Sequence, residues 1–234
     1  MIHVYPAHER FESNHGWLQS YFSFSFAEYF DRKNMHFGPL RVFNDDIIAP
    51  QRGFGAHPHQ EMEIVTVVLK GKLEHRDNLG NHRIISFGEV QRMTAGTGIV
   101  HSEMNPSTTE EVNLLQLWFL PETYGLAPSY EQISYDVENM KNRLLPIVSK
   151  KQADERVAYI HQDITMYLSD LENNNQLTFH QQERRRMYVF VIEGELVLND
   201  DTVLQRRDAA RITDVTRLHI AANIDSRFML IDLP

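Results

Sequence analysis

The sequence contains no cysteine among its 234 residues. The absence of thiols excludes disulfides, zinc–thiolate sites, iron–sulfur clusters and cysteine nucleophiles, so any metal must be bound by histidine and carboxylate side chains. Those side chains are plentiful, because the chain has 12 histidines and 32 acidic residues. The length is sufficient for one large domain or for two smaller ones, each with its own hydrophobic core.

Positive charge and long apolar runs are also scarce. The chain has 23 Lys and Arg against 32 Asp and Glu, a net charge of -9. Phosphate backbones are bound by clustered basic residues, so this composition argues against nucleic acid or an anionic membrane as partner and favours a small ligand. The most apolar stretch, 114–120, includes Gln116, and the first ten residues lack a basic segment followed by an apolar one. We expect a soluble, cytoplasmic protein.

Helical periodicity is weak throughout the chain. Its best instances, at 26–32 and 133–145, are short or interrupted. Apolar runs of four to eight residues bounded by Gly, Asn, Asp or Pro are common instead, and this pattern is typical of strands. Clear instances are 64–69, 112–120, 188–192 and 228–233. The sequence therefore predicts a mainly β fold, as a sandwich or barrel.

One short segment is repeated. Residues 67–73, Val-Val-Leu-Lys-Gly-Lys-Leu, match residues 190–196, Phe-Val-Ile-Glu-Gly-Glu-Leu, at an offset of 123. Half the chain length is a natural offset for a duplicated barrel, although a glycine hairpin turn alone recurs in many β proteins. Gly125 and Pro128 mark a connection. We predict two halves, 1–125 and 126–234.

Two pairs of side chains in the first half have the spacing of metal ligands. His57 and His59 share one face of a strand, as do His101 and Glu103, because alternate residues point the same way. Neighbouring strands would bring together three imidazoles and one carboxylate, a donor set that suits Fe, Ni, Cu, Mn or Zn. Glu63 is a rival carboxylate, and alternation alone does not choose between Glu63 and Glu103.

A structural role is the ordinary interpretation of a single strand histidine, and two pairs together shift the balance toward ligands. Pro58, between the first two histidines, also favours a strand edge such as a barrel mouth. The remaining histidines lack a partner at ligand spacing, and we expect solvated roles for His3, His8, His36, His75, His82 and His161.

The second half does not repeat the ligand set. The offset of 123 aligns His57, His59, Glu63, His101 and Glu103 with His180, Gln182, Arg186, Ile224 and Ser226. His219 lies near the fourth of these positions, but a His-x-His pair and a carboxylate partner are missing. We predict that the second half binds no metal.

These motifs resemble those of the cupins and, more closely, of the pirin family, whose bacterial members include quercetin 2,3-dioxygenases. His57, His59, Glu63 and Gly71 follow the first cupin motif with one extra residue before the glycine. Residues 88–98, His101 and Asn105 are similar to the second motif, with Gly96 in place of its usual proline. The pirin-like segments are 14–17, 24–31, 41–46, 55–59 and 93–103. The second half is similar in length to the degenerate C-terminal cupin of pirins.

The resemblance implies an all-β fold of two tandem cupin barrels, also called jelly rolls or double-stranded β-helices. It implies an N-terminal cupin at 1–125 with the metal and a degenerate cupin at 126–234 without one. The implied ligands are His57, His59, His101 and Glu103, with Glu63 as a hydrogen-bond partner of a ligand. The implied cofactor is one divalent transition metal, first iron(II), with Ni, Cu, Mn, Co or Zn as alternatives.

The resemblance also implies an activity. The metal acts as a Lewis acid on the 3-hydroxyl of a flavonol such as quercetin, and Glu103 accepts the proton. The electron-rich flavonolate then reacts with O2, the central ring opens and carbon monoxide is released. Apolar walls for such a substrate are available from Phe22, Phe24, Phe26, Phe43, Met93 and Trp118.

Two other functions stay open. Eukaryotic pirins suggest a metal-sensing regulatory protein that binds a transcription factor or another protein. The basic run 184–186 is the one candidate surface for it in the sequence, and a solvated charge run is its ordinary interpretation. The third hypothesis is a dioxygenase with a different enolisable or aromatic substrate, since a fold and a metal site do not define the substrate.

Overall fold

The computed structural model describes residues 1–151 and 155–234, and these residues form an all-β protein. Helix in the described part is limited to two short 3-10 segments, η1 (Ala7–Glu9) and η2 (Val137–Met140). The predicted all-β class is thus confirmed. Of the two stretches with weak helical spacing, 26–32 forms turns, and 133–145 contains η2 between strand residues. No helix of the described residues is long and apolar enough to cross a membrane.

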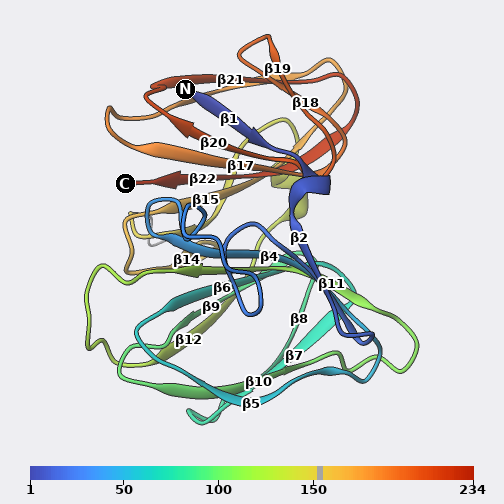
Figure 1. The fold of residues 1–234 in the computed structure, drawn as a ribbon, viewed down its shortest axis with the longest axis vertical. Helices are drawn as coiled ribbons and strands as arrows, with labels where there is room; N and C mark the ends of the chain where they lie inside the picture. The colour runs from blue at the N-terminus through green and yellow to red at the C-terminus, as the bar shows by residue number, and fades with distance from the viewer. Residues whose placement is uncertain (152–154) are drawn as a thin grey trace. The chain divides into compact units, whose positions relative to one another are not determined.

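The N-terminal barrel comprises Phe11–Tyr135 and the described residues up to Gln162. One large sheet has the order β12-β9-β6-β11-β4-β3-β2, and a second sheet has the order β5-β10-β7-β8. Figure 1 shows β5 and β10 opposite the sheet that contains β6 and β9. The strands are β2 (Phe11–Asn14), β3 (Leu18–Phe22), β4 (Leu40–Ile48), β5 (Gly53–His59), β6 (Glu63–Lys70), β7 (Lys72–Asp77), β8 (His82–Ser86), β9 (Glu89–Thr94), β10 (Ile99–Met104), β11 (Val112–Phe119), β12 (Ser129–Ser134) and β14 (Ala158–Tyr159).

The C-terminal barrel comprises Met1–Arg10, Asp136–Lys151 and Asp163–Pro234. Within these residue ranges its strands run in the orders β1-β20-β17-β22-β15-β13 and β16-β21-β18-β19, and β21 and β18 lie opposite β20 and β17 in Figure 1. The strands are β1 (Ile2–Tyr5), β13 (Leu145–Ser149), β15 (Thr165–Leu171), β16 (Gln176–His180), β17 (Arg186–Glu193), β18 (Leu196–Leu198), β19 (Thr202–Leu204), β20 (Ala209–Thr213), β21 (Arg217–Ala222) and β22 (Ser226–Leu233).

The sequence repeat corresponds to a repeat of topology. β6 and β17 begin and end 123 residues apart, and each is paired on both sides within the large sheet of its own barrel. Each strand is followed directly by a glycine in the left-handed region, Gly71 with φ 80° and Gly194 with φ 88°. The remaining strands of each barrel follow in the same spatial order, so the seven-residue match marks equivalent turns of two related barrels.

The barrels do not divide at residue 125 as the sequence predicts. β1 pairs with β20, and so the first strand of the chain belongs to the C-terminal barrel. β12 pairs with β9, and so the strand just after the predicted boundary belongs to the N-terminal barrel. Each of these strands covers the edge of a large sheet that would otherwise expose unpaired backbone groups. Hydrophobic pattern locates strands, but it does not state with which sheet a strand pairs.

The two interiors differ. An apolar cluster of the C-terminal barrel includes Val189, Leu218 and Ile220, with Leu177 and Phe179 of β16 packed against it. The N-terminal barrel has separate apolar clusters, one around Val68 and Leu114 and another around Ile64 and Met93. Buried polar side chains occupy other parts of this interior, among them Asn44, Asp46, Thr66, His75, Gln91, His101 and Glu103.

Candidate metal centre

β5 and β10 carry the four residues with ligand spacing. The strands are antiparallel, with His101 opposite His57 and Ile99 opposite His59. Alternation along β10 buries His101 and Glu103, which are 1% and 3% exposed, while the residue between them faces outward. A register shift between His101 and Glu103 places Glu103 opposite Phe54. Such an irregularity re-aims a side chain next to a site.

Three imidazoles converge. Ligand atoms of His57, His59 and His101 all lie within 4.8 Å of one another. The Nε2 atoms of His57 and His101 are 3.0 Å apart. The Nδ1 atom of His57 lies 2.8 Å from the Gly55 carbonyl oxygen, and a carbonyl accepts only a protonated nitrogen. His57 Nε2 is therefore the atom with a free lone pair, and it points at the neighbouring histidines.

The geometry fits a metal ion. The Nε2 atom of His59 is buried and has no hydrogen-bond partner among residues 1–151 and 155–234. Two nitrogen ligands about 2.1 Å from one ion and at right angles to each other are about 3 Å apart, which is the His57–His101 separation. Burial and the neighbouring His57 lower the pKa of His59 to about 4, so this imidazole is neutral at pH 7, which is the form that binds metals.

Glu103 is held at the back of the site by amides. Its Oε1 accepts a hydrogen bond from Gln91 Nε2 at 3.2 Å, and its Oε2 accepts one from Gln116 Nε2 at 2.9 Å. Burial raises the pKa of Glu103 to about 7, although the hydrogen bonds from Gln91 and Thr66 oppose the rise. Its carboxylate lies within 4.8 Å of ligand atoms of His101 and His75, a second group of potential ligands. Glu103 thus adjoins the three-histidine cluster through His101.

His75 is not solvated, and that prediction is wrong. Its side chain is fully buried and stacks on Tyr130 with ring centroids 4.5 Å apart. Its Nε2 lies 2.9 Å from Asp77 Oδ2, and its Nδ1 lies 3.4 Å from His101 Nδ1. His75 Nε2–H donates a hydrogen bond to Asp77 Oδ2, and His101 Nδ1–H donates one to the bare Nδ1 of His75. The Nε2 lone pair of His101 is then free to face His57.

The local sequence already contains a signal for this pair. His75 and Asp77 have the i, i+2 spacing of two residues on one strand face. What sequence reasoning missed is the pairing of β7 with β10, which puts His75 opposite Glu103 and Asp77 opposite His101.

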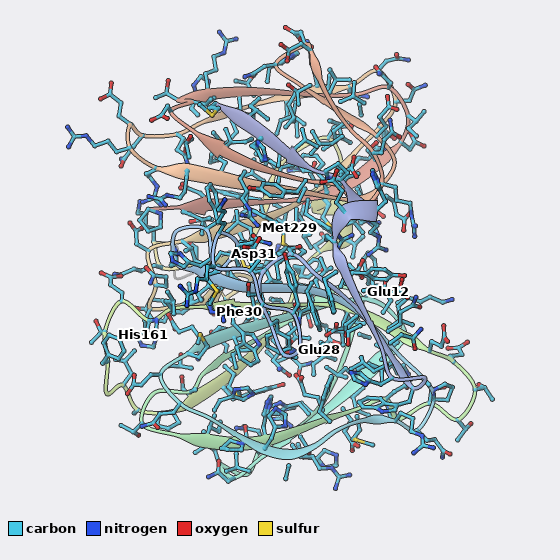
Figure 2. All side chains as sticks on the ribbon, in the orientation of Figure 1. Glu12, Glu28, Phe30, Asp31, His161 and Met229 are labelled. Atoms are coloured by element: carbon cyan, nitrogen blue, oxygen red, sulfur yellow. The ribbon has the colours of Figure 1, made fainter. Side chains whose placement is uncertain are left out.

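Glu63 has a different role from the one implied by resemblance. Its buried carboxylate accepts hydrogen bonds from the backbone N–H groups of His161 at 3.0 Å and Gln162 at 2.7 Å, and from Thr94 Oγ1 at 3.1 Å. The His161 ring also contacts it, with Nδ1 at 3.1 Å. These contacts anchor the segment that ends the N-terminal barrel, and Figure 2 labels His161. His161 is therefore hydrogen-bonded rather than simply solvated.

A cavity of about 280 Å³ opens onto the histidines. Trp118 covers His59 with ring centroids 4.8 Å apart, and Phe26 meets Trp118 at 5.3 Å. Glu28, labelled in Figure 2, lies in the connection between β3 and β4 and accepts a hydrogen bond from Ser13. The lining residues are Ser13, His15, Leu18, Ser20, Phe22, Phe26, Ala27, Glu28, Asn44, Asp46, Phe54, His57, His59, Glu103, Gln116 and Trp118.

The aromatic walls agree only partly with the sequence-based set. Phe22, Phe26 and Trp118 line the cavity, and Phe54 joins them. Phe24, Phe43 and Met93 are fully buried and are not among the lining residues. Alternation accounts for Phe43, because its neighbour Asn44 on β4 lines the cavity and adjacent residues of a strand point to opposite faces. Phe24 lies beyond the end of β3, where alternation does not apply.

A larger hollow of about 500 Å³ lies on the C-terminal barrel. Four of its charged side chains form ion pairs within the hollow, Lys141 with Glu172 at 2.7 Å and Arg227 with Asp170 at 2.6 Å. It contains no histidine among its lining residues. The chemistry of the molecule is therefore better placed in the smaller cavity.

The interior of the C-terminal barrel is apolar at the equivalent place. β16 pairs with β21 as β5 pairs with β10, and Leu177 and Phe179 lie opposite Ile220 and Leu218. His219 faces away, with its ring nitrogens hydrogen-bonded to Asp200 at 2.8 Å and Gln176 at 2.9 Å. The absence of metal in this half stays a prediction.

Both halves of the chain match models of known protein families. Residues 4–119 match the family model described as Pirin, and residues 146–233 match the one described as Quercetinase C-terminal cupin domain. The chain is 42% identical over 234 residues to a protein of Escherichia coli strain K12 named quercetin 2,3-dioxygenase, covering 100% of this chain and 99% of the relative.

Solved structures agree in fold. A crystal structure of a bacterial pirin from Escherichia coli in complex with nickel(II) superposes with a TM-score of 0.94 at 41% identity, covering 100% of this chain and 99% of that one. A quercetin 2,3-dioxygenase from Acinetobacter baumannii has a TM-score of 0.78 at 22% identity, covering 98% of this chain and 85% of that one, a likeness of fold alone.

Proposed function

This chain belongs to the pirin family, and from that premise we propose that it is a metal-dependent dioxygenase that opens the central ring of a flavonol such as quercetin. O2 is the second substrate, and one ring carbon leaves as carbon monoxide. The observation that carries the proposal is the convergence of three imidazoles at an aromatic-lined cavity. The full-length relative named quercetin 2,3-dioxygenase supports the choice of substrate.

The proposed ligands are His57, His59, His101 and Glu103. When bound, the ion supplies Lewis acidity toward the 3-hydroxyl of the flavonol. Trp118 and Phe26 hold the flat ring system and exclude water from it. Gln116 connects the two groups, because it donates to Glu103 at 2.9 Å and accepts from Trp118 Nε1 at 3.1 Å.

Glu103 is the proposed proton acceptor. It lines the cavity, so the 3-hydroxyl of a bound flavonol can reach a carboxylate oxygen. The amides of Gln91 and Gln116 hold the carboxylate in a fixed orientation as the proton arrives. Removal of the proton makes the flavonol electron-rich and reactive toward O2. Glu103 is the catalytic residue of this proposal.

Iron(II) is the proposed native ion, and the cytoplasm is the proposed location. Imidazole and carboxylate ligands suit non-haem iron as well as nickel, which the similar Escherichia coli pirin contains. The cysteine-free sequence is compatible with a reducing compartment. Flavonol and O2 are the proposed partners, and the acidic net charge of -9 argues against nucleic acid.

The regulatory alternative has less support from the site. The basic run 184–186 is partly neutralised within the chain, since Arg185 pairs with Asp163 at 2.7 Å and with Asp232 at 2.8 Å. A cation already paired on both sides is a poor anchor for an acidic partner protein.

The test is turnover by protein loaded separately with Fe, Ni, Cu or Mn. The flavonol absorbance should bleach only in the presence of O2, with release of carbon monoxide. His57→Ala should lose the metal, and Glu103→Gln should keep metal but lose turnover. His180→Ala, at the repeat-equivalent position of the other barrel, is the matched control and should change neither. No turnover with any of the four metals would contradict the proposed function.

A further inference from the structure

One wall of the metal-site cavity carries polar side chains that the proposed chemistry does not use. Asn44 and Asp46 stand two residues apart on β4 and both line the cavity. They are 4% and 3% exposed. The Oδ1 atom of each is buried and has no hydrogen-bond partner in the described part of the chain.

Strand pairing directs both side chains into the barrel. Asn44 lies opposite Gln116 of β11, whose side chain reaches Glu103, and opposite Phe22 of β3, which lines the cavity. Asp46 lies opposite Ser20, another lining residue. The polar wall and the metal centre therefore belong to one cavity, at different strands.

Unpaired buried oxygens are unfavourable, because these groups lose their hydration without gaining a partner. Neighbouring inward positions show that apolar residues fit this surface, since Leu18 precedes Ser20 by two and Leu114 lies opposite Asp46. Packing alone therefore gives no reason for an amide and a carboxylate here. Two acceptors aimed into a ligand cavity indicate a ligand with donor groups.

We propose that Asn44 and Asp46 form a hydroxyl-binding subsite that selects aromatic substrates with hydroxyl groups on a ring other than the one held at the metal centre. The inference rests on the proposed function, because it assumes that a flavonol occupies the cavity. The ligand's flat body lies against the aromatic wall that includes Phe22, Phe26 and Trp118. Its outer hydroxyl groups then donate to the two Oδ1 atoms, which regain the hydrogen bonds lost on burial.

The subsite distinguishes ligands by the number of hydroxyl groups on their outer ring. A site built to hydrogen-bond a hydroxyl rejects the analogue that lacks it, because its own polar groups are then left unpaired. Flavonols that share the 3-hydroxyl but differ in the outer ring, with two hydroxyl groups or none, should therefore bind differently. Their interaction with the metal centre is the same.

The experiment measures dissociation constants of these two flavonols, without O2, on metal-loaded protein by fluorescence quenching. Wild type should bind the dihydroxylated flavonol about tenfold more tightly than the one without outer hydroxyl groups. Asp46→Leu and Asn44→Leu should each reduce that ratio toward one at unchanged metal content. Asp46→Asn keeps an acceptor oxygen and should retain part of the preference. Asp200→Leu, the same charge change at a residue whose side chain is 81% exposed on the C-terminal barrel, should leave the ratio unchanged.

The outcomes separate this inference from the proposed function. A hydroxyl preference that disappears in the variants supports the subsite even if O2 produces no turnover. Turnover with a ratio unchanged in Asn44→Leu and Asp46→Leu overturns the subsite and leaves the dioxygenase standing. Should Asp46→Leu fail to fold, an unchanged ratio in Asn44→Leu overturns the subsite and a reduced ratio supports it.

Discussion

At the scale of single residues, the metal centre depends on which nitrogen of each histidine carries the proton. The carbonyl oxygen of Gly55 accepts a hydrogen bond from Nδ1–H of His57. His75 accepts the corresponding hydrogen bond from Nδ1–H of His101, and Asp77 fixes His75 through a further hydrogen bond. A chain from carboxylate to imidazole to ligand fixes ring orientation and raises ligand basicity.

Asp77→Asn should weaken metal binding. The amide no longer enforces protonation of His75 at Nε2, so His75 no longer reliably accepts the His101 proton. We expect about 10- to 100-fold lower metal affinity, measured by chelator competition. Asp201→Asn, an exposed aspartate on the C-terminal barrel, is the control. Unaltered affinity in Asp77→Asn would falsify the positioning role.

Asp46 should make the metal-free protein less stable as pH rises. Burial raises its pKa to about 7, above the value near 4 of an unfolded chain, so the folded state holds the proton more tightly between these values. Its contribution to the free energy of unfolding therefore falls through this window, by up to about 1 kcal/mol per pH unit.

The measurement is urea unfolding at pH 5 and pH 8 for wild type and Asp46→Asn, both without metal. Asp46→Asn should lose less stability between the two pH values, because it has no proton to release. Comparing the two proteins cancels the titrating groups that do not interact with Asp46. Equal losses would show that Asp46 does not titrate as its burial demands.

At the scale of secondary structure elements, the turns after β6 and β17 are equivalent in the two barrels. A Cβ on Gly71 would lie 2.6 Å from the Glu111 carbonyl oxygen, and one on Gly194 would lie 2.5 Å from that of Asp225. Both glycines also have positive φ. The glycine of the sequence repeat is thus required twice over, by conformation and by space.

Gly71→Ala and Gly194→Ala should each destabilise the protein more than Gly80→Ala does. Gly80 has φ 92°, but a Cβ at this position would meet nothing within 4 Å, so it tests the conformational part alone. We expect about 1 kcal/mol for Gly80→Ala and at least about 1 kcal/mol more for the other two, measured by chemical unfolding. Equal effects at all three positions would contradict the argument from close approach.

At the scale of the whole molecule, each barrel is completed by a strand that lies outside its simple half of the sequence. β1 completes the C-terminal barrel through β20, and Ile2 and Val4 pack against the apolar cluster of that barrel. β12 completes the N-terminal barrel through β9. A cut between two sequence halves would leave both large sheets with an exposed edge.

Val4→Asp should destabilise the C-terminal barrel and leave metal binding intact. The charge would be placed against an apolar cluster at a cost of about 1–3 kcal/mol. Hydrogen exchange should rise in β20 and not in β9. His3→Asp, on the exposed face of the same strand, is the control. Faster exchange in β9 after Val4→Asp would indicate that β1 supports the other barrel.

The sequence by itself determined the all-β class, the repeat and the residues of the histidine cluster. Each of these depends on spacing along one chain segment: alternation puts His57 and His59 on one face, and a shared turn relates the two barrels. His101 joins them because β10 pairs with β5.

Only the tertiary structure decided which side chains surround that cluster. Local alternation is the same whichever strands pair, so it does not reveal that β7 brings His75 to His101 or that β4 brings Asp46 to the cavity. Glu63 shows the same limit, since its partners at 161–162 lie almost a hundred residues further along the chain. The three members of the histidine cluster follow from local periodicity, whereas the side chains that surround them are brought there by pairing between distant strands.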